Sequence, residues 1–155
     1  MKKSFTASFI LFLIFSFNYV NAQTGNLSIT QTNDGSVIDI NIYIKRTGAI
    51  PWNLGYASLV FNYNYNAMNT PVETAEGIWD NNSNAQYDDQ TISFYNGNKC
   101  VSVEIGLSNV STGTAVPTDS ALAGKIRFNI SDPLQNHDIT WNTIYSSVLD
   151  NNGND

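Results

Sequence analysis

Apolar and polar residues alternate with a period of two along most of this chain, which is typical of half-buried β-strands. In the clearest segment, residues 36–47, four isoleucines lie at every second position and mostly polar residues lie between them. β-branched side chains suit a strand of this kind. The same alternation predicts a shorter strand over residues 26–31, and the Asp34-Gly35 pair between the two segments is a typical hairpin turn. The chain therefore opens with a predicted β-hairpin.

The most aromatic strand is predicted over residues 55–65, with the sequence GYASLVFNYNY. Alternation places Phe61 and Tyr63 on the same side as an alanine and a leucine, whereas the asparagines face the opposite side. A sugar-binding strip would need rings and amides on one exposed surface. The pattern therefore favours rings that line a hydrophobic core, with Tyr65 emerging at the end of the strand, and a sugar-binding strip is the alternative.

Alternation is lost in residues 66–90, where no strand is assigned, and it returns in the second half of the chain. Strands are predicted over residues 91–95, 100–107 and 121–130, and residues 138–149 supply one or two more that carry Trp141 and Tyr145. The Asn96-Gly97 pair predicts a second hairpin turn. Seven to nine short strands separated by turns indicate an all-β fold, an antiparallel β-sandwich.

The first 22 residues have the features of a secretory signal peptide. Two lysines near the N-terminus precede an apolar run, residues 9–17, which is too short to span a bilayer. Small residues at Val20 and Ala22 predict cleavage after Ala22, with an uncleaved anchor as the alternative. We therefore expect an extracellular or cell-surface protein with one domain over residues 23–155 and no membrane insertion after cleavage.

Composition narrows the partners that such a domain can bind. The hydrophobic content of 42%, with 12% aromatic residues, can sustain a packed core. The formal net charge is −6 and becomes more negative when the signal peptide leaves, so nucleic acid and anionic membranes are excluded as expected partners. Cys100 is the only cysteine, so it is predicted to be a small buried residue, with an intermolecular disulfide as the alternative.

No set of residues with the pattern of a catalytic site is found in the sequence. His137 is the only histidine, and it is predicted to lie exposed in a loop without a suitable serine or cysteine nearby. Glu73, Glu76 and Asp80 are close enough in sequence to suggest paired carboxylates, yet surface carboxylates are expected in an acidic domain. The sequence therefore predicts a protein that is not an enzyme.

The last residues, DNNGND, resemble the start of a calcium-binding loop. Asp150, Asn152 and Asn154 provide oxygen atoms at alternate positions. The sixth position holds Asp155 where such a loop requires glycine. A simple turn is the favoured interpretation. No metal or other cofactor is expected, and calcium is the weak alternative.

The loop over residues 66–90 is the best candidate for ligand recognition. Trp79 lies in it among polar residues that include Asn81 and Asn82, and Tyr87 follows. Indole and phenol rings stack well on sugars, and amides form hydrogen bonds with hydroxyl groups. The alternative is that Trp79 folds back and covers the open end of the sandwich. Trp79, Tyr87, Asn81 and Asn82 are therefore the predicted ligand-binding residues.

Two segments of the chain resemble cohesin-type domains. GYASLVFNYNYNAMN, residues 55–69, is similar to an apolar cohesin strand that ends in tyrosine, asparagine and methionine residues. ALAGKIRFNISD, residues 121–132, resembles a later strand that begins with small residues. From Gln23 onward the chain is similar to the N-terminal cohesin-like domains of bacterial surface proteins that are exported by type IX secretion.

The resemblance implies a jelly-roll-like sandwich related to carbohydrate-binding modules, and it implies no catalytic residue. It also implies that residues 141–155 continue into further strands, so the domain is expected to be the N-terminal part of a longer protein. The predicted function is a secreted interaction or adhesion module at the cell surface, with a protein partner. The alternative is a carbohydrate-binding module that recognises an extracellular polysaccharide through residues 66–90.

Overall fold

The computed structural model describes residues 24–69, 71–95, 97, 99–108 and 112–154. The predicted signal peptide lies outside this part of the chain, and so does Asn96 of the second predicted turn. Nine β-strands are present in the described residues, and none of these residues forms a helix that could cross a membrane.

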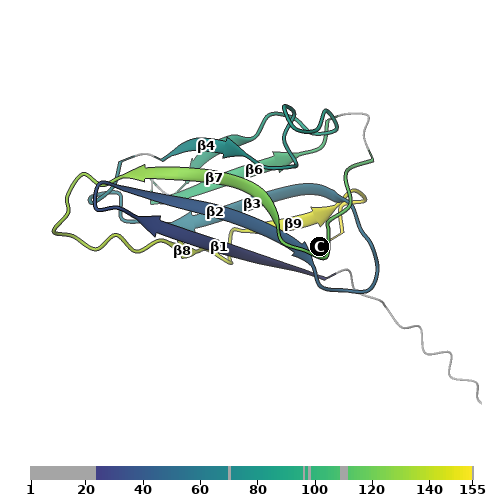
Figure 1. The fold of residues 1–155 in the computed structure, drawn as a ribbon, viewed down its shortest axis with the longest axis horizontal. Coiled ribbons are helices and arrows are strands. Elements are labelled where there is room, and N and C mark those ends of the chain that lie inside the picture. Colours follow the sequence, from purple (N-terminus) through teal and green to yellow (C-terminus); the bar gives the residue numbers. More distant parts are fainter. Residues whose placement is uncertain (1–23, 70, 96, 98, 109–111, 155) are drawn as a thin grey trace, which may run out of the picture.

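The strands form two antiparallel sheets that face each other (Figure 1). In order across the sheet, the four-stranded sheet consists of β1 (Gly25–Asn33), β2 (Val37–Arg46), β7 (Ala121–Asn129) and β4 (Val72–Glu76). The five-stranded sheet consists of β5 (Thr91–Tyr95), β6 (Cys100–Gly106), β3 (Leu54–Asn62) and β8 (Thr140–Trp141), and β9 (Ser147–Asp150) also pairs with β3. The predicted antiparallel β-sandwich is confirmed.

The core between the sheets is built by the alternating residues that the sequence indicated. On β2, the four isoleucines are at most 1% exposed. In the aromatic segment, Phe61 is fully buried and its ring stacks on that of Trp141, with 4.4 Å between ring centroids. Tyr63 is also buried and packs at 5.1 Å against Phe128, whereas Tyr65 is 44% exposed. The interpretation of this segment as part of the core is confirmed.

Two parts of the chain differ from the predictions. β4 lies within residues 66–90, where no strand was assigned, because in this short edge strand the apolar Val72 is exposed and the charged Glu73 is half-buried, so residue type does not follow the alternation. Tyr145 was placed on a strand, but it lies in the turn between β8 and β9 and is 59% exposed. The first difference concerns an edge strand and the second a turn, and neither has the regular burial of a central strand.

Cys100 is buried, as expected for a small residue in a strand. Its Sγ atom donates a hydrogen bond to Oδ1 of Asn62 on the neighbouring strand β3, at 3.2 Å. Access to the thiol is therefore restricted in the folded chain, which favours the structural interpretation over an intermolecular disulfide.

Candidate functional site

The two aromatic residues predicted to bind a ligand lie inside the protein. Trp79 is fully buried and Tyr87 is 1% exposed, and both belong to the hydrophobic core. The Tyr87 hydroxyl donates a hydrogen bond to the Leu54 carbonyl at 2.8 Å and accepts one from the Thr114 amide at 2.7 Å. Neither ring can stack on a sugar in this conformation. The structure therefore agrees with the alternative in which Trp79 folds back into the sandwich.

Hydrogen bonds to the buried carboxylate of Asp80 fix the backbone next to Trp79. Asp80 accepts hydrogen bonds from the backbone amide of Asn82, at 2.8 Å, and from that of Gln90, at 2.7 Å. These bonds join the middle of the loop to its last residue, Gln90, and hold the residue next to Trp79 in place. Because the bond to Gln90 crosses ten positions, the alternation pattern contains no sign of it.

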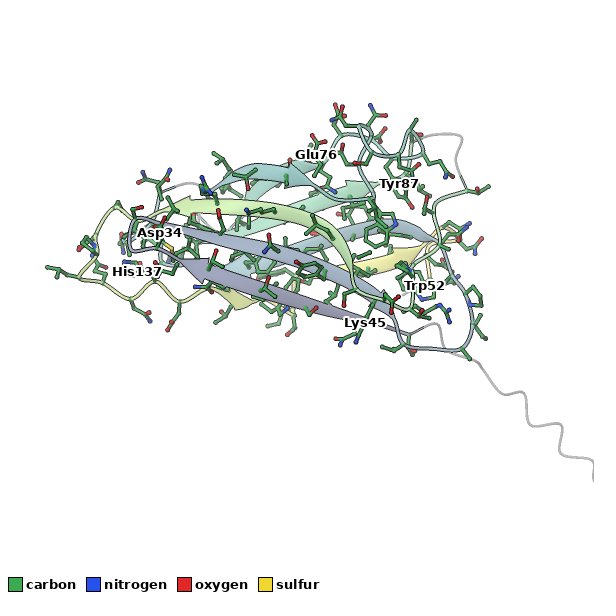
Figure 2. All side chains as sticks on the ribbon, viewed as in Figure 1. Asp34, Lys45, Trp52, Glu76, Tyr87 and His137 are labelled. Atoms are coloured by element: carbon green, nitrogen blue, oxygen red, sulfur yellow. The ribbon has the colours of Figure 1, made fainter. Side chains whose placement is uncertain are left out.

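The two predicted asparagines remain at the surface. Asn81 and Asn82 are both exposed, and the Asn82 side-chain amide donates to both carboxylate oxygens of Glu76, at 3.0 and 2.8 Å. Figure 2 shows Glu76 and Tyr87 at the same end of the sandwich. The Asn82 amide group thus already has an internal acceptor, and ligand binding by Asn81 and Asn82 stays a prediction.

The three carboxylates considered for catalysis do lie near one another, but their environments differ. Glu73 is half-buried beside Glu76 and Asp80. Burial, followed by repulsion from those two carboxylates, raises the pKa of Glu73 from 4.5 to about 7. No group of three or more acidic, histidine or cysteine side chains in the described ranges is placed to hold a metal ion.

The raised pKa makes Glu73 a pH-dependent destabilising residue. Between pH 4.5 and about 7 the folded chain binds the Glu73 proton more tightly than the unfolded chain, so stability falls as the pH rises through this window. We expect Glu73→Gln to raise the urea midpoint of unfolding at pH 8 and to leave it nearly unchanged at pH 4. The control is Asp119→Asn, which removes one negative charge at an exposed position. An equal effect of Glu73→Gln at both pH values would contradict the proposed proton uptake.

His137 and the C-terminal turn have structural partners. His137 is partly buried rather than exposed as expected, and its Nε2 atom lies 2.8 Å from the carbonyl oxygen of Asp132 in the same loop. Asp150 is 3% exposed and accepts hydrogen bonds from the backbone amides of Asn152 and Asn154, both at 2.8 Å. Burial alone would raise its pKa, but the amide hydrogen bonds outweigh burial and lower the pKa to about 2. The carboxylate of Asp150 therefore stabilises the C-terminal turn through these hydrogen bonds.

A second candidate surface is the outer face of the five-stranded sheet, which the sequence did not single out. Glu104 on β6 accepts hydrogen bonds from three hydroxyl groups. The donors are Tyr56 at 2.6 Å, Ser58 at 3.0 Å and the neighbouring Ser102. Tyr56 and Ser58 lie on β3, so the cluster connects the two adjacent strands β3 and β6. We call these four residues the hydroxyl cluster.

The hydroxyl cluster is fixed in position but accessible to a partner. Tyr56 is 39% exposed, whereas Ser58 and Ser102 are buried. The neighbouring strand β5 places Thr91 opposite Glu104, so a further hydroxyl group lies on this face. The surface therefore presents one exposed phenol ring and one carboxylate on a β-sheet with mainly uncharged side chains. Only the pairing of β3 with β6 brings these residues together, which is why the sequence pattern alone did not reveal them.

The outer face of the four-stranded sheet differs in its electrostatics. Asp39 on β2 forms a bidentate ion pair with Arg127 on β7, at 2.7 and 2.8 Å, and Lys125 lies at 3.4 Å. The hydrogen bonds from Arg127 lower the pKa of Asp39 to about 2. The centres of protein interfaces are poor in charged residues and rich in tyrosine. The face with the hydroxyl cluster is therefore the better candidate for docking.

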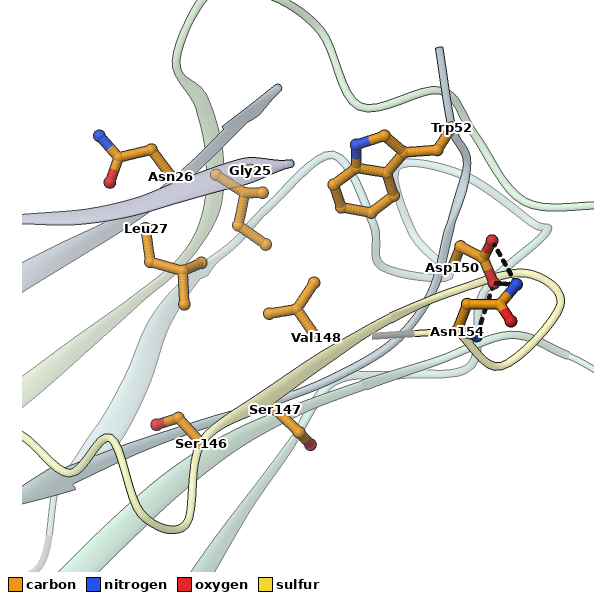
Figure 3. Close-up of a pocket in the computed structure, with 10 residues that line it drawn as sticks. Gly25, Asn26, Leu27, Trp52, Ser146, Ser147, Val148, Asp150 and Asn154 are labelled. Carbon is orange, nitrogen blue, oxygen red and sulfur yellow. Dashed lines mark hydrogen bonds between the residues drawn. The ribbon is translucent and has the colours of Figure 1, made fainter. Parts of the chain in front are cut away.

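A cavity of about 230 Å³ opens at one end of the sandwich, between β1 and β9 (Figure 3). Leu27, Ile44 and Val148 supply apolar side chains to its lining, and Trp52 also lines it. Trp52 is 8% exposed, and its indole Nε1 has no hydrogen-bond partner among the described residues. Asn154 in the C-terminal turn also lines the cavity.

Comparisons with known proteins identify the fold. No protein-family model matches the sequence, and no curated protein is significantly similar to it. Solved structures of cohesin modules do match. A cohesin from Clostridium acetobutylicum, CaCohA2, has a TM-score of 0.59 at 13% identity, over 86% of this chain and 83% of that one.

Two modules of Acetivibrio cellulolyticus agree with this result. The second type II cohesin of the adaptor scaffoldin ScaA has a TM-score of 0.57 at 8% identity, covering 86% of this chain and 83% of that chain. A mutant of a type II cohesin–X-dockerin complex has a TM-score of 0.59 at 7% identity, covering 84% of this chain and 90% of that chain. The chain therefore has a cohesin-like β-sandwich fold.

Proposed function

We propose that this protein is a non-catalytic protein-binding module that docks its partner on the outer face of the five-stranded sheet. The observation that carries the proposal is the hydroxyl cluster. Tyr56 is held against Glu104 at 2.6 Å and still exposes 39% of its surface. A tyrosine fixed in this way loses little conformational freedom on binding, and tyrosine is among the residues that contribute most to interfaces.

The similar structures support a protein partner. Several of them are complexes of a cohesin with a dockerin, among them the type II complex from Acetivibrio cellulolyticus and a type I complex from Clostridium thermocellum. A dockerin module is therefore the first partner to test. Sequence identity to these structures is low, at 7% and 13%, so the residues that contact a partner have to be identified on this chain itself.

Export and cell-surface adhesion complete the proposal. The signal peptide predicted over residues 1–22, with cleavage after Ala22, would deliver the domain to the cell surface, and the resemblance to surface proteins of the type IX route agrees with this. Polysaccharide binding through Asn81 and Asn82 is the alternative function. Retardation of the protein in gels that contain a polysaccharide, lost in Asn81→Ala, would support that alternative.

Two tyrosines on opposite outer faces allow a matched test of the docking face. Tyr56 lies on β3, and Tyr43 lies on β2 between two buried isoleucines and therefore faces outward from the other sheet. We expect Tyr56→Ser to weaken binding to a dockerin module, or to another secreted protein partner, by about tenfold or more. We expect Tyr43→Ser to leave binding unchanged. Biolayer interferometry measures both, and circular dichroism confirms that both variants fold.

Two results would contradict the proposal. One is the absence of binding to any protein in a panel of dockerin modules and proteins secreted by the source organism. The other is a larger loss in Tyr43→Ser than in Tyr56→Ser, which would move the interface to the four-stranded sheet.

A further inference from the structure

No residue of strand β4 belongs to the hydrophobic core. Among the described residues β4 is the outermost strand of its sheet, and it pairs only with β7 (Figure 1). None of its five residues is buried, and Val72 is 51% exposed. The pairing is interrupted by a bulge between Glu73 and Ala75. A segment with few buried apolar contacts is the kind that opens locally while the rest of a domain stays folded.

The chain on both sides of β4 is held more firmly than the strand itself. Before β4, the amide of Asn69 donates a hydrogen bond to the carbonyl of Asn129 at 2.9 Å. After β4, the amide of Ile78 donates to the carbonyl of Leu122 at 3.0 Å, and the next residue is the fully buried Trp79. β4 can therefore separate from β7 while the residues that flank it keep their contacts.

Glu73 is the residue of β4 that acts against the paired position of the strand. It lies opposite the fully buried Ile126, so its side chain is directed to the inner side of the sheet. Its Oε1 atom is buried and has no hydrogen-bond partner among the described residues. Burial of a charged oxygen without a hydrogen bond costs free energy. The paired position of β4 is therefore favoured when Glu73 is neutral and disfavoured when Glu73 is ionised.

The acidic groups around Glu73 add to this cost. Glu76 lies on the same strand, and Asp80 follows in the loop. Burial opposes the ionisation of Asp80, but hydrogen bonds from the backbone amides of Gln90 and Asn82 outweigh burial and lower its pKa. Asp80 thus carries a fixed negative charge at neutral pH, and this charge repels an ionised Glu73.

The positive charges on the neighbouring strand β7 are engaged elsewhere. Lys125 and Arg127 both pair with Asp39 on the outer face of the sheet, at 3.4 and 2.7 Å. Strand β5, to which the loop after β4 leads, contains no charged residue. Neither strand therefore offers a free cation to balance a charge on Glu73.

We propose that β4 is a pH-gated edge strand, which separates from β7 when Glu73 ionises while both sheets otherwise remain folded. Separation brings the Glu73 carboxylate into water and away from Asp80, and the proton passes to the solvent. The edge of β7 that is exposed in this way includes Lys125 and Arg127. Charges on an edge strand reduce pairing with other chains, so the open form is protected from edge-to-edge association. The gate lies in the sheet that does not contain the hydroxyl cluster, so it acts independently of partner docking.

The pH range of opening follows from the two states of Glu73. The pKa of Glu73 is about 7 while β4 is paired, because of burial and the two neighbouring carboxylates, and returns to its ordinary value of 4.5 when the strand is open. The open form therefore gains population as the pH rises from 4.5 to 7 and changes little above that range. Between pH 5 and pH 8 the equilibrium constant for opening should increase on the order of fiftyfold.

Amide hydrogen exchange, measured by nuclear magnetic resonance on the chain from Gln23 onward, tests the proposal, because that chain includes all nine strands. Protection factors are compared, since they correct for the faster intrinsic exchange at high pH. We expect the protection of the β4 amides to fall roughly fiftyfold between pH 5 and pH 8, and that of the central strand β2 to stay constant. In Glu73→Gln the β4 amides should remain protected at pH 8. Asp119→Asn, which removes a charge at an exposed position, is the control and should behave as the parent.

Three results would overturn the proposal. An equal loss of protection in β4 and β2 would show that ionisation of Glu73 weakens the whole domain and does not release one strand. A loss in β4 that persists in Glu73→Gln would show that another group controls the opening. A carbon-13 titration in which the Glu73 carboxyl has its ordinary pKa of 4.5 would remove the driving force.

Discussion

We expect Trp79→Ala to lower the free energy of unfolding by about 3–5 kcal/mol, as do other truncations of buried aromatic residues. Trp79 is fully buried in the core, and it is among the largest side chains there. Its removal leaves a cavity that the backbone cannot close, because Asp80 is held by hydrogen bonds to Asn82 and Gln90. Since small domains are typically stable by about 5–15 kcal/mol, this loss is a large part of the total.

Urea unfolding followed by far-ultraviolet circular dichroism measures the effect. Trp79→Phe is the control, because it keeps an aromatic ring in the site and should cost clearly less than Trp79→Ala. The alternative function gives a different outcome. If Trp79→Ala unfolded at the same urea concentration as the parent and lost its retardation by a polysaccharide, the ring would be a sugar-binding platform and not part of the core.

Trp79 also shows what the sequence pattern could and could not predict. Strands β2, β3, β6 and β7 were found because each turns hydrophobic residues toward the core at every second position. The long loop has no such constraint. Its polar neighbours suggested an exposed ring, whereas the hydrogen bond that fixes Asp80 beside the buried Trp79 comes from Gln90, ten positions away.

The candidate docking face could not be predicted for a related reason. Tyr56 and Glu104 are separated by 48 positions, and each is one outward-facing residue in an ordinary alternating strand. Only the register between β3 and β6, which pairs Ser58 with Glu104, brings the hydroxyl groups around one carboxylate. Resemblance to cohesins predicted the fold, which the structural comparisons confirm, but did not identify these residues.

We expect Gly55→Ala to destabilise the protein by about 3 kcal/mol, at the upper end of the usual cost of overpacking. A Cβ atom on Gly55 would lie 2.2 Å from the carbonyl oxygen of Asp150 and 2.8 Å from Cα of Asn151. These are backbone atoms, so no side-chain rotation can relieve the contact. β9 would have to move away from β3, with which it pairs on both sides of Gly55.

Gly106→Ala provides the control, because Gly106 is opposite Tyr56, the next residue of β3, and a Cβ atom there meets nothing within 4 Å. That substitution should be neutral or stabilising by about 0.4–1 kcal/mol, since alanine restricts the unfolded chain. The difference between the two variants in urea midpoint isolates the steric effect from the general effect of replacing glycine in a strand. Displacement of β9 would also move Val148 and Asp150, which line the cavity beside β1. Equal stability of the two variants would show that β9 does not pack closely on β3, and the cavity would then lack its β9 wall.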